Sequence, residues 1–487
     1  MLRSLVVVSL AASAALLAAC GTSANLDATS LLRQSEAAMG GAALKSIQFT
    51  TRGSGSTFGQ AFESGMAWPR LNYPLLTRLV DYENAALRED FGRSRAEPNG
   101  GGAIPLMGLG EQRATTFVRG DLAWNLVGGN PAPAPVARFD RQHDIWTTPH
   151  GVLKAALRNA ASASRRTEGG QTRSVVSFRQ PGVLSASVWI GADGLVERVE
   201  ALRPHPVLGD VASVTHYSDY RDFGGVKFPM RIRQSQGSFE VLDLAVQEVL
   251  PNAPVDITVP DAVRNASERV SAEKVTDGIW FLAGGSHNSV AIEMADHLMV
   301  VEAPLHDGRA AAVLAEAKKL APGKPVRFVV NSHHHFDHSG GLRAAAAEGA
   351  TLVTSARAQP YFERVLANPN SIAPDLLARS GRQVSILGVS GKRVFADTTR
   401  TVEVHEFTGS IHAQGMLMVH LPKERLLIQA DAYTPAPAGS APPAVANANH
   451  VNLVDNIERL RLGVDRILPL HGRVVPLADL HAAIGRR

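Results

Sequence analysis

The chain of 487 residues contains a single cysteine, so an internal disulfide, a cysteine-based zinc site and an iron–sulfur cluster are excluded. Hydrophobic residues make up 45% and charged residues 19%, which is typical of folded protein, and the length suggests two domains. The net charge of +4 arises from 49 basic and 45 acidic residues without a basic cluster, so we expect no nucleic-acid partner.

The N-terminus has the pattern of an export signal. Met1–Arg3 give a short positive start, and an apolar run over residues 5–17 follows. This run is too short to span a bilayer but has the length of a signal-peptide core. It ends at Leu17–Ala18–Ala19–Cys20, which resembles the cleavage box of bacterial lipoproteins.

The lipoprotein resemblance implies a location. Residues 1–19 would be removed as a signal peptide, Cys20 would be lipidated, and residues 20–27 would form a tether. Gly21, in place of aspartate, would direct the anchor to the outer membrane of the bacterial cell envelope, facing the periplasm. The alternative is an ordinary signal peptide cut at an Ala-x-Ala site, with Cys20 incidental.

Residues 28–265 have the pattern of a β-rich domain that follows a first helix. Gly191–Gly194 and Gly224–Gly225 each separate two strand-like runs and predict hairpins. Helices are expected at Ala28–Met39 and His150–Ser162, strands at Ile47–Arg52, Ala114–Val118, Val175–Phe178 and Ser187–Ile190, and loops at 97–110 and 128–136. A series of hairpins with few helices predicts one curved antiparallel sheet.

This β-rich segment loosely resembles the half-barrel of lipoprotein carriers of the outer-membrane sorting type. The strand with Phe228–Pro229 and the Val259–Pro260 ending after the turn at 252–254 carry the resemblance. It implies a concave apolar face for a lipid or an extended substrate. We favour the simpler interpretation that the domain packs against its neighbour or acts as a spacer.

From residue 270 to 487 strands and helices alternate, which predicts an α/β layer structure. A tight strand pair is expected around 295–297, with helices at Arg309–Leu320 and Leu342–Glu348 and strands at Val326–Val330 and Thr351–Val353.

Potential metal ligands are concentrated directly after the strand at Val326–Val330. The sequence His333–His334–His335–Phe336–Asp337–His338 has the form His-x-His-x-Asp-His, and imidazole and carboxylate are the common zinc ligands. It resembles the signature of the metallo-β-lactamase superfamily. Further segments fit the later motifs of that family in order: Thr408–His412, Ile428–Asp431 and Leu468–Gly472.

The resemblance covers about residues 273–475. It implies an αββα sandwich with two zinc ions, for which iron and manganese are alternatives. Carried over to this chain, one metal would be held by His333, His335 and His412, the other by Asp337, His338 and His471, and Asp431 would bridge the two. The other histidines of this half are expected to be ordinary residues, with His334 pointing away: His287, His306, His405, His420 and His450.

The implied reaction is hydrolysis of a small-molecule substrate by a metal-bound hydroxide. Asp337 would also orient the nucleophile or relay its proton, and Tyr433 could donate a hydrogen bond to substrate. Because Asp431 stands where many β-lactamases have cysteine or serine, the resemblance favours an ester, thioester, lactone or amide substrate. The alternatives are a β-lactam hydrolase, an iron-dependent sulfur-oxidising enzyme, and a lipid- or lipoprotein-binding envelope protein with a non-catalytic metal domain. The oligomeric state is not predicted.

Overall fold

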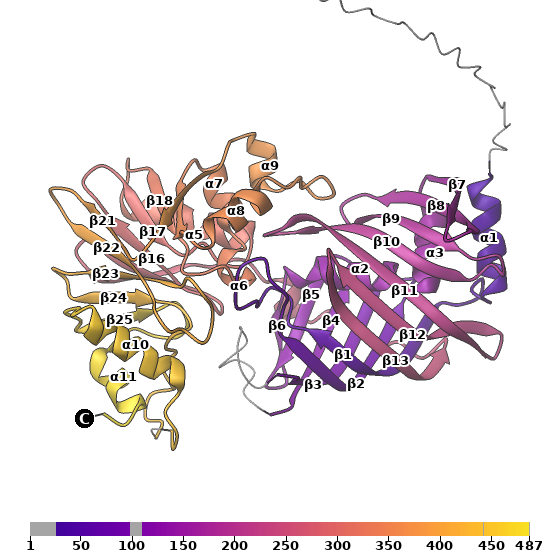
Figure 1. The fold of residues 1–487 in the computed structure, drawn as a ribbon, viewed down its shortest axis with the longest axis horizontal. Helices are drawn as coiled ribbons and strands as arrows, with labels where there is room; N and C mark the ends of the chain where they lie inside the picture. Colours follow the sequence, from indigo (N-terminus) through magenta and orange to yellow (C-terminus); the bar gives the residue numbers. More distant parts are fainter. Residues whose placement is uncertain (1–25, 98–109, 442, 487) are drawn as a thin grey trace, which may run out of the picture.

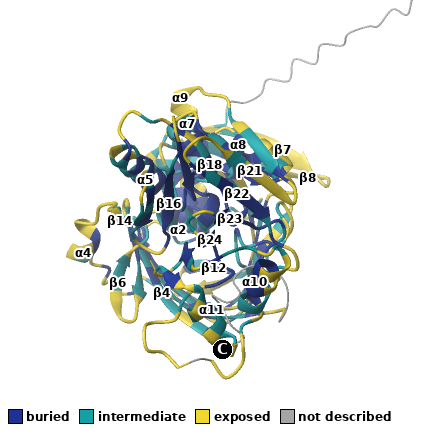
Figure 2. Cartoon of the chain, turned by 90° about the vertical axis from the view of Figure 1, so that its left-hand side faces the viewer, coloured by how far each residue is buried: buried dark blue, intermediate teal, exposed yellow. Residues whose placement is uncertain are grey.

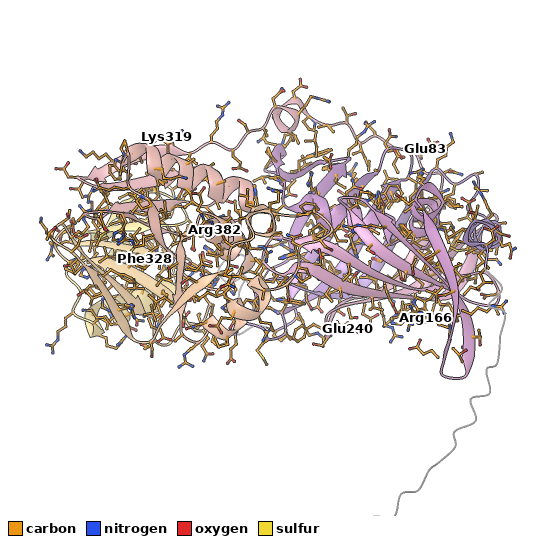
Figure 3. All side chains as sticks on the ribbon, turned by 90° about the horizontal axis from the view of Figure 1, so that it is seen from above. Glu83, Arg166, Glu240, Lys319, Phe328 and Arg382 are labelled. Atoms are coloured by element: carbon orange, nitrogen blue, oxygen red, sulfur yellow. The ribbon has the colours of Figure 1, made fainter. Side chains whose placement is uncertain are left out.

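The computed structural model describes residues 26–97, 110–441 and 443–486, which form two domains lying end to end (Figures 1 and 3). The predicted signal peptide, Cys20, most of the tether and most of the loop at 97–110 lie outside these residues. In the described part of the chain, every helix is too short or too polar to cross a membrane.

A large antiparallel sheet dominates the N-terminal domain. Among the described residues it has thirteen strands, in the order β6-β5-β4-β3-β2-β1-β13-β12-β11-β10-β9-β8-β7. Their bounds are β1 Ser46–Ser56, β2 Arg70–Asp81, β3 Ala86–Arg95, β4 Gln112–Arg119, β5 Leu122–Val127, β6 Asn130–Pro133, β7 Ala161–Glu168, β8 Gln171–Gln180, β9 Leu184–Ile190, β10 Val196–His205, β11 Gly209–Phe223, β12 Val226–Gln236 and β13 Phe239–Pro251. Two meanders therefore join where the first strand pairs with the last.

Three helices pack on this sheet and close its core: α1 Ala28–Ala38, α2 Ala137–Trp146 and α3 Pro149–Arg158. Helix α2 contacts β3, β5 and β10, so the sheet curves around it. Phe49 and Phe228 lie in the core beneath, with ring centroids 4.9 Å apart. The predicted antiparallel sheet is confirmed, whereas the resemblance to a lipid-carrier half-barrel and the favoured role in packing or spacing stay predictions.

Two expectations about local structure in this domain were wrong. Helix α3 ends at Arg158, and residues 161–168 form the edge strand β7 where the helix was expected to continue. The side chain of Asn159 bonds to the carbonyl of Ala155, a local contact that favours helix termination. In addition, part of the expected loop at 128–136 pairs with β5 as the short edge strand β6, whose prolines an edge tolerates.

The C-terminal domain has the predicted αββα sandwich. Its first sheet contains β14 Ser271–Thr276, β15 Ile279–Ala283, β16 Ser289–Glu293, β17 Leu298–Val301, β18 Val326–Val330, β19 Thr351–Ser355 and β20 Ser385–Val389. Its second sheet contains β21 Lys392–Ala396, β22 Thr401–Glu406, β23 Leu417–Leu421, β24 Leu426–Gln429, β25 Arg466–Pro469 and β26 Val475–Pro476. One apolar core of buried residues lies between the two sheets. Figure 2 shows these inner strands in the colour of buried residues.

Helices cover the outer face of each sheet. They are α5 Asp307–Leu320, α6 Phe336–Ser339, α7 Leu342–Ala347, α8 Gln359–Leu366 and α9 Leu376–Ser380 along the first sheet, and α10 Ala448–Arg459 and α11 Leu477–Ala483 along the second. The short α4, Asp261–Arg264, lies in the connection between the domains.

The two domains share buried contacts. Val207, in the turn between β10 and β11, is 1% exposed and belongs to the same apolar core as α5 and α7. Next to it, the backbone N–H of Asp210 donates to the carbonyl of Pro369, and the Asp210 carboxylate accepts from the Ser371 hydroxyl. The N-terminal domain is thus packed against the C-terminal domain and not merely linked to it.

Candidate metal centre

The chain brings the predicted ligands together at one edge of the sandwich. The segment 333–338 follows β18, His412 follows β22, Asp431 follows β24 and His471 follows β25. Because β24 and β25 are parallel neighbours, the residues after them meet at the same edge. Loops at strand ends can direct side chains inward from several directions, as a metal site requires.

The first group of ligand atoms belongs to His333, His335, His412 and Asp431, all of them buried. Nε2 of His333 lies 2.9 Å from Nδ1 of His335 and 3.2 Å from Nε2 of His412. Two nitrogens bound to one tetrahedral zinc would be about 3.3 Å apart, so these separations suit ligands of a shared ion.

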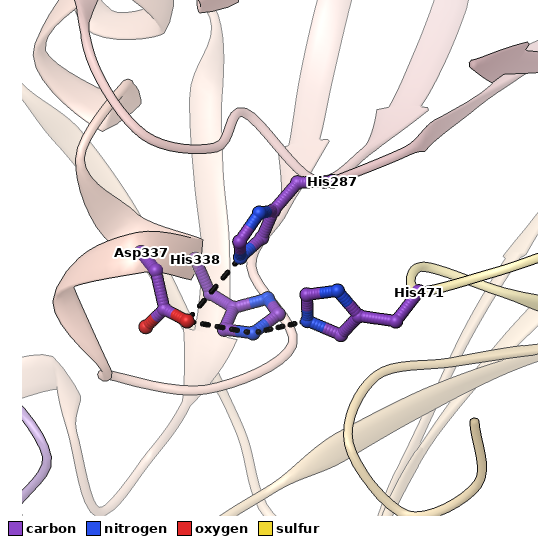
Figure 4. Close-up of side chains that lie close together, drawn as sticks. All are labelled: His287, Asp337, His338 and His471. Atoms are coloured by element: carbon purple, nitrogen blue, oxygen red, sulfur yellow. Dashed lines mark hydrogen bonds and ion pairs between the residues drawn. The ribbon is translucent and has the colours of Figure 1, made fainter. Parts of the chain in front are cut away.

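The second group contains Asp337, His338 and His471, as predicted, together with His287 (Figure 4). Nε2 of His338 lies 3.2 Å from Nε2 of His471, and Nε2 of His287 lies 3.2 Å from Oδ2 of Asp337. His287 was expected to be an ordinary histidine, but the structure places its ring among the predicted ligands of the second group.

Asp431 connects the two groups. Its Oδ2 lies 2.9 Å from Nε2 of His412 and 3.1 Å from Nε2 of His338, and its Oδ1 lies 2.9 Å from Nε2 of His471. The residue has a φ of +58°, which is unfavourable for an aspartate and is characteristic of functional sites. The carboxylate is in the position that a bridging ligand needs.

The hydrogen bonds on the outside of the cluster fix the histidine tautomers. His335 donates its Nε2–H to the carbonyl of Ala61, and His471 donates its Nδ1–H to the carbonyl of Ser286. His338 directs Nδ1 at the carboxylate of Glu302, 2.9 Å away. The opposite ring nitrogens then present lone pairs to one another, an arrangement that a cation stabilises. The residues thus fit a pair of metal ions.

The pKa values agree with this arrangement. Burial lowers the pKa of His333 and His335 well below the usual value, which keeps these rings neutral. Burial also opposes charge on His338, but the carboxylates of Asp431 and Asp337 outweigh it and raise its pKa. Burial would raise the pKa of Asp431, yet the facing histidines hold it well below the usual range. Without a metal, a proton on His338 therefore balances the ionised Asp431 and Asp337, in the place that a cation would take.

Glu302 supports the centre although it was not among the predicted site residues. It is 0% exposed, has a φ of +75° and accepts hydrogen bonds from Ser332 N (3.2 Å) and Ser332 Oγ (2.5 Å) as well as facing His338. A carboxylate behind a histidine ligand orients the ring and raises its basicity. Glu302 directly follows β17, and the pairing of β17 with β18 brings it to the centre.

The remaining candidates lie outside the two groups. His334 donates a hydrogen bond to the carbonyl of Ala61, which agrees with its predicted orientation away from the metals. Tyr433 is 3% exposed, and its ring packs edge-on against His450 at 4.9 Å. Its contact with substrate stays a prediction. A separate group near β22 and β23, His405, His420 and Glu403, is held by hydrogen bonds between the histidines and the carboxylate.

Residues 282–471 match the family model of the metallo-beta-lactamase superfamily. The C-terminal domain belongs to this superfamily. The match covers less than half of the chain and leaves the N-terminal sheet outside it.

Individual similar proteins are distant. The alpha subunit of 2,4-dinitroanisole O-demethylase from Nocardioides sp. (strain JS1661) is 23% identical over 192 residues, which are 39% of this chain and 54% of that protein. The chain thus spans about half the length of this relative.

Similar solved structures are distant as well. A metallo-beta-lactamase from Pontibacter korlensis is 16% identical, with a TM-score of 0.34, over 45% of this chain and 98% of its own. A rubredoxin oxygen:oxidoreductase from Desulfovibrio gigas is 13% identical, with a TM-score of 0.35, over 44% and 61%. Scores this low establish nothing about the activity of the superfamily domain described here.

Proposed function

We propose that this protein is a dinuclear metal-dependent hydrolase with two zinc ions. The observation that carries the proposal is the contact of Asp431 with histidines of both ligand groups, within 2.9–3.1 Å. A single structural ion needs four closed ligands and no bridging carboxylate. Seven predicted ligands with a bridge suit a two-metal site.

The chain's residues provide the rest of the chemistry. Bound metal would supply Lewis acidity and a water of lowered pKa. The proposed role of Asp337, whose carboxylate contacts Gln60 and His287, is to orient that water or take its proton. The buried histidines keep competing water out of the ligand sphere, since His333, His335 and His338 are at most 1% exposed.

The proposed substrates are esters, thioesters, lactones or amides. The aspartate at position 431 supports this choice, and β-lactams are the second candidate class. The O-demethylase relative adds a third class to be tested, because its name specifies an aromatic methyl ether. We also propose that the enzyme is anchored in the cell envelope through Cys20.

The decisive experiment combines metal analysis with a substrate panel. We expect about two metal ions per purified chain and turnover of at least one ester, thioester or lactone, with 2,4-dinitroanisole and a β-lactam in the same panel. Removal of the bridge in Asp431→Ala should lower turnover by several orders of magnitude at an unchanged unfolding temperature of the N-terminal domain. Metal-free wild-type protein, or full activity of Asp431→Ala, would contradict the proposal.

A further inference from the structure

A segment of the N-terminal domain lies directly against the metal-ligand loops. After β1 the chain runs through residues 57–69 before β2 begins. Within this connection, the carbonyl of Ala61 accepts hydrogen bonds from Nε2 of both His334 and His335, each at 2.9 Å. One of these histidines is a ligand of the first group, so a residue 274 positions away fixes its tautomer.

The neighbouring residue contacts the second group. Gln60 donates its Nε2–H to Oδ1 of Asp337 at 2.8 Å, while Oδ2 of the same carboxylate faces His287. An aspartate ligand whose other oxygen is hydrogen-bonded keeps a fixed orientation toward its metal.

Backbone hydrogen bonds attach the same segment to both motif loops. The N–H of Phe336 donates to the carbonyl of Gly59 at 3.3 Å, and the N–H of Gln414 donates to the carbonyl of Phe62 at 2.7 Å. The first motif loop carries four predicted ligands and the second carries His412. The segment 59–62 therefore connects two parts of the centre that β18 and β22 hold separately.

Aromatic packing fixes the position of this segment. The ring of Phe58 lies edge-on to Phe336 at 5.2 Å and to His205 at 5.3 Å, and it contacts Trp68 at 4.5 Å. Gly59 has a φ of +85°, and a Cβ on it would come within 2.3 Å of the Phe336 ring. Only glycine allows this close approach.

We infer that residues 59–62 of the N-terminal domain form the outer layer of the metal centre, with Gln60 as a positioning residue. The N-terminal sheet is then required for metal affinity and is not a spacer. The inference rests on the proposed metal binding but not on the proposed hydrolysis. Hydrogen-bond partners behind metal ligands commonly change metal affinity by about 10- to 100-fold.

The test measures metal affinity in the metal-stripped full-length protein by competition of Zn²⁺ and Co²⁺ with a chelator. Gln60→Ala should lower the affinity for the ion held by Asp337 about tenfold and leave the affinity for the other ion unchanged. Gln60→Met keeps most of the side-chain size and adds no charge but removes the donor, so its affinity for that ion should be about as low as that of Gln60→Ala. Gln247→Ala, an exposed glutamine on β13, is the matched control and should bind as the wild type does.

A second variant moves the segment itself. Gly59→Val should displace the Ala61 carbonyl from His335 and lower the affinity for both ions. Thermal unfolding of this variant will show whether the fold persists. Unchanged affinities in both Gln60 variants would overturn the inference whatever Gly59→Val does. A wild-type protein that binds no metal would instead overturn the proposed function, and one that binds two ions but hydrolyses nothing would leave this inference standing.

Discussion

His287 places a ring nitrogen beside Asp337 and packs its ring 4.3 Å from that of His471. Its Nδ1 is 2.8 Å from the hydroxyl of Ser286, and burial lowers its pKa, so the ring is neutral and able to bind metal or to orient the carboxylate.

We expect His287→Ala to lose about 10- to 100-fold in affinity for the ion of the second group and little for that of the first. Titration with Zn²⁺ against a chelator measures both constants. His216→Ala, at an exposed position on β11, should match the wild type. Equal loss at both groups would show that His287 acts through the fold and not through Asp337.

The difference between predicted and missed site residues has a physical reason. The segment from His333 to His338 is recognisable because four potential ligands fall within six positions, a density that chance rarely produces. Glu302 and His287 stand alone in the sequence. Glu302 follows β17, the neighbour of β18, and His287 lies between β15 and β16, so only the pairing of the strands and the return of the chain after β15 bring them to the centre. Residues that act through tertiary contacts carry little local signal.

At the scale of elements, helix α3 holds a buried histidine against the sheet. His150 is 1% exposed, its Nε2 lies 3.3 Å from the carbonyl of Met39, and its ring stacks on Phe228. Burial lowers its pKa to about 4, although the hydrogen bond opposes this. Protonation therefore favours the unfolded chain, whose histidine has a pKa near 6.5.

This histidine should make the protein sensitive to acid. Its contribution is complete above pH 6.5 and is lost as the pH falls toward 4, a loss of about 3 kcal/mol. Urea unfolding at pH 7 and at pH 4 should show a smaller decrease in the free energy of unfolding for His150→Gln than for the wild type. An equal decrease in both proteins would contradict the assignment.

The elements that were predicted in the C-terminal domain lie within two residues of their observed bounds because each has one strong periodic or buried pattern, as in Val326–Val330. The N-terminal domain was harder to predict. Helix α2 was missed because its sequence is polar on average and buries only one side, through Gln142, His143, Ile145 and Trp146. The pairing of β1 with β13 could not be predicted, since it joins strands nearly 200 residues apart.

At the scale of the whole molecule, the predicted lipid anchor decides where the proposed enzyme would work. In a bacterial host, the wild type should incorporate labelled palmitate and sediment with membranes, because several acyl chains anchor firmly. Cys20→Ser should lose the label and leave the membrane fraction. Label retained by Cys20→Ser would contradict lipidation at this residue, and an unlabelled wild type would favour ordinary signal-peptide cleavage.

The hydrogen bonds that Ala61 accepts from the histidine motif also set an order of assembly. During synthesis, residues 59–62 leave the ribosome long before His335, and domains generally fold from the N-terminus onward. We therefore expect the Ala61 carbonyl to be part of a folded N-terminal domain before His335 is synthesised, so that the ligand loops fold against this domain. If the chain binds metal as proposed, we expect loading to follow the folding of both domains, so a defect in the N-terminal half would appear first as poor metal retention in the C-terminal half.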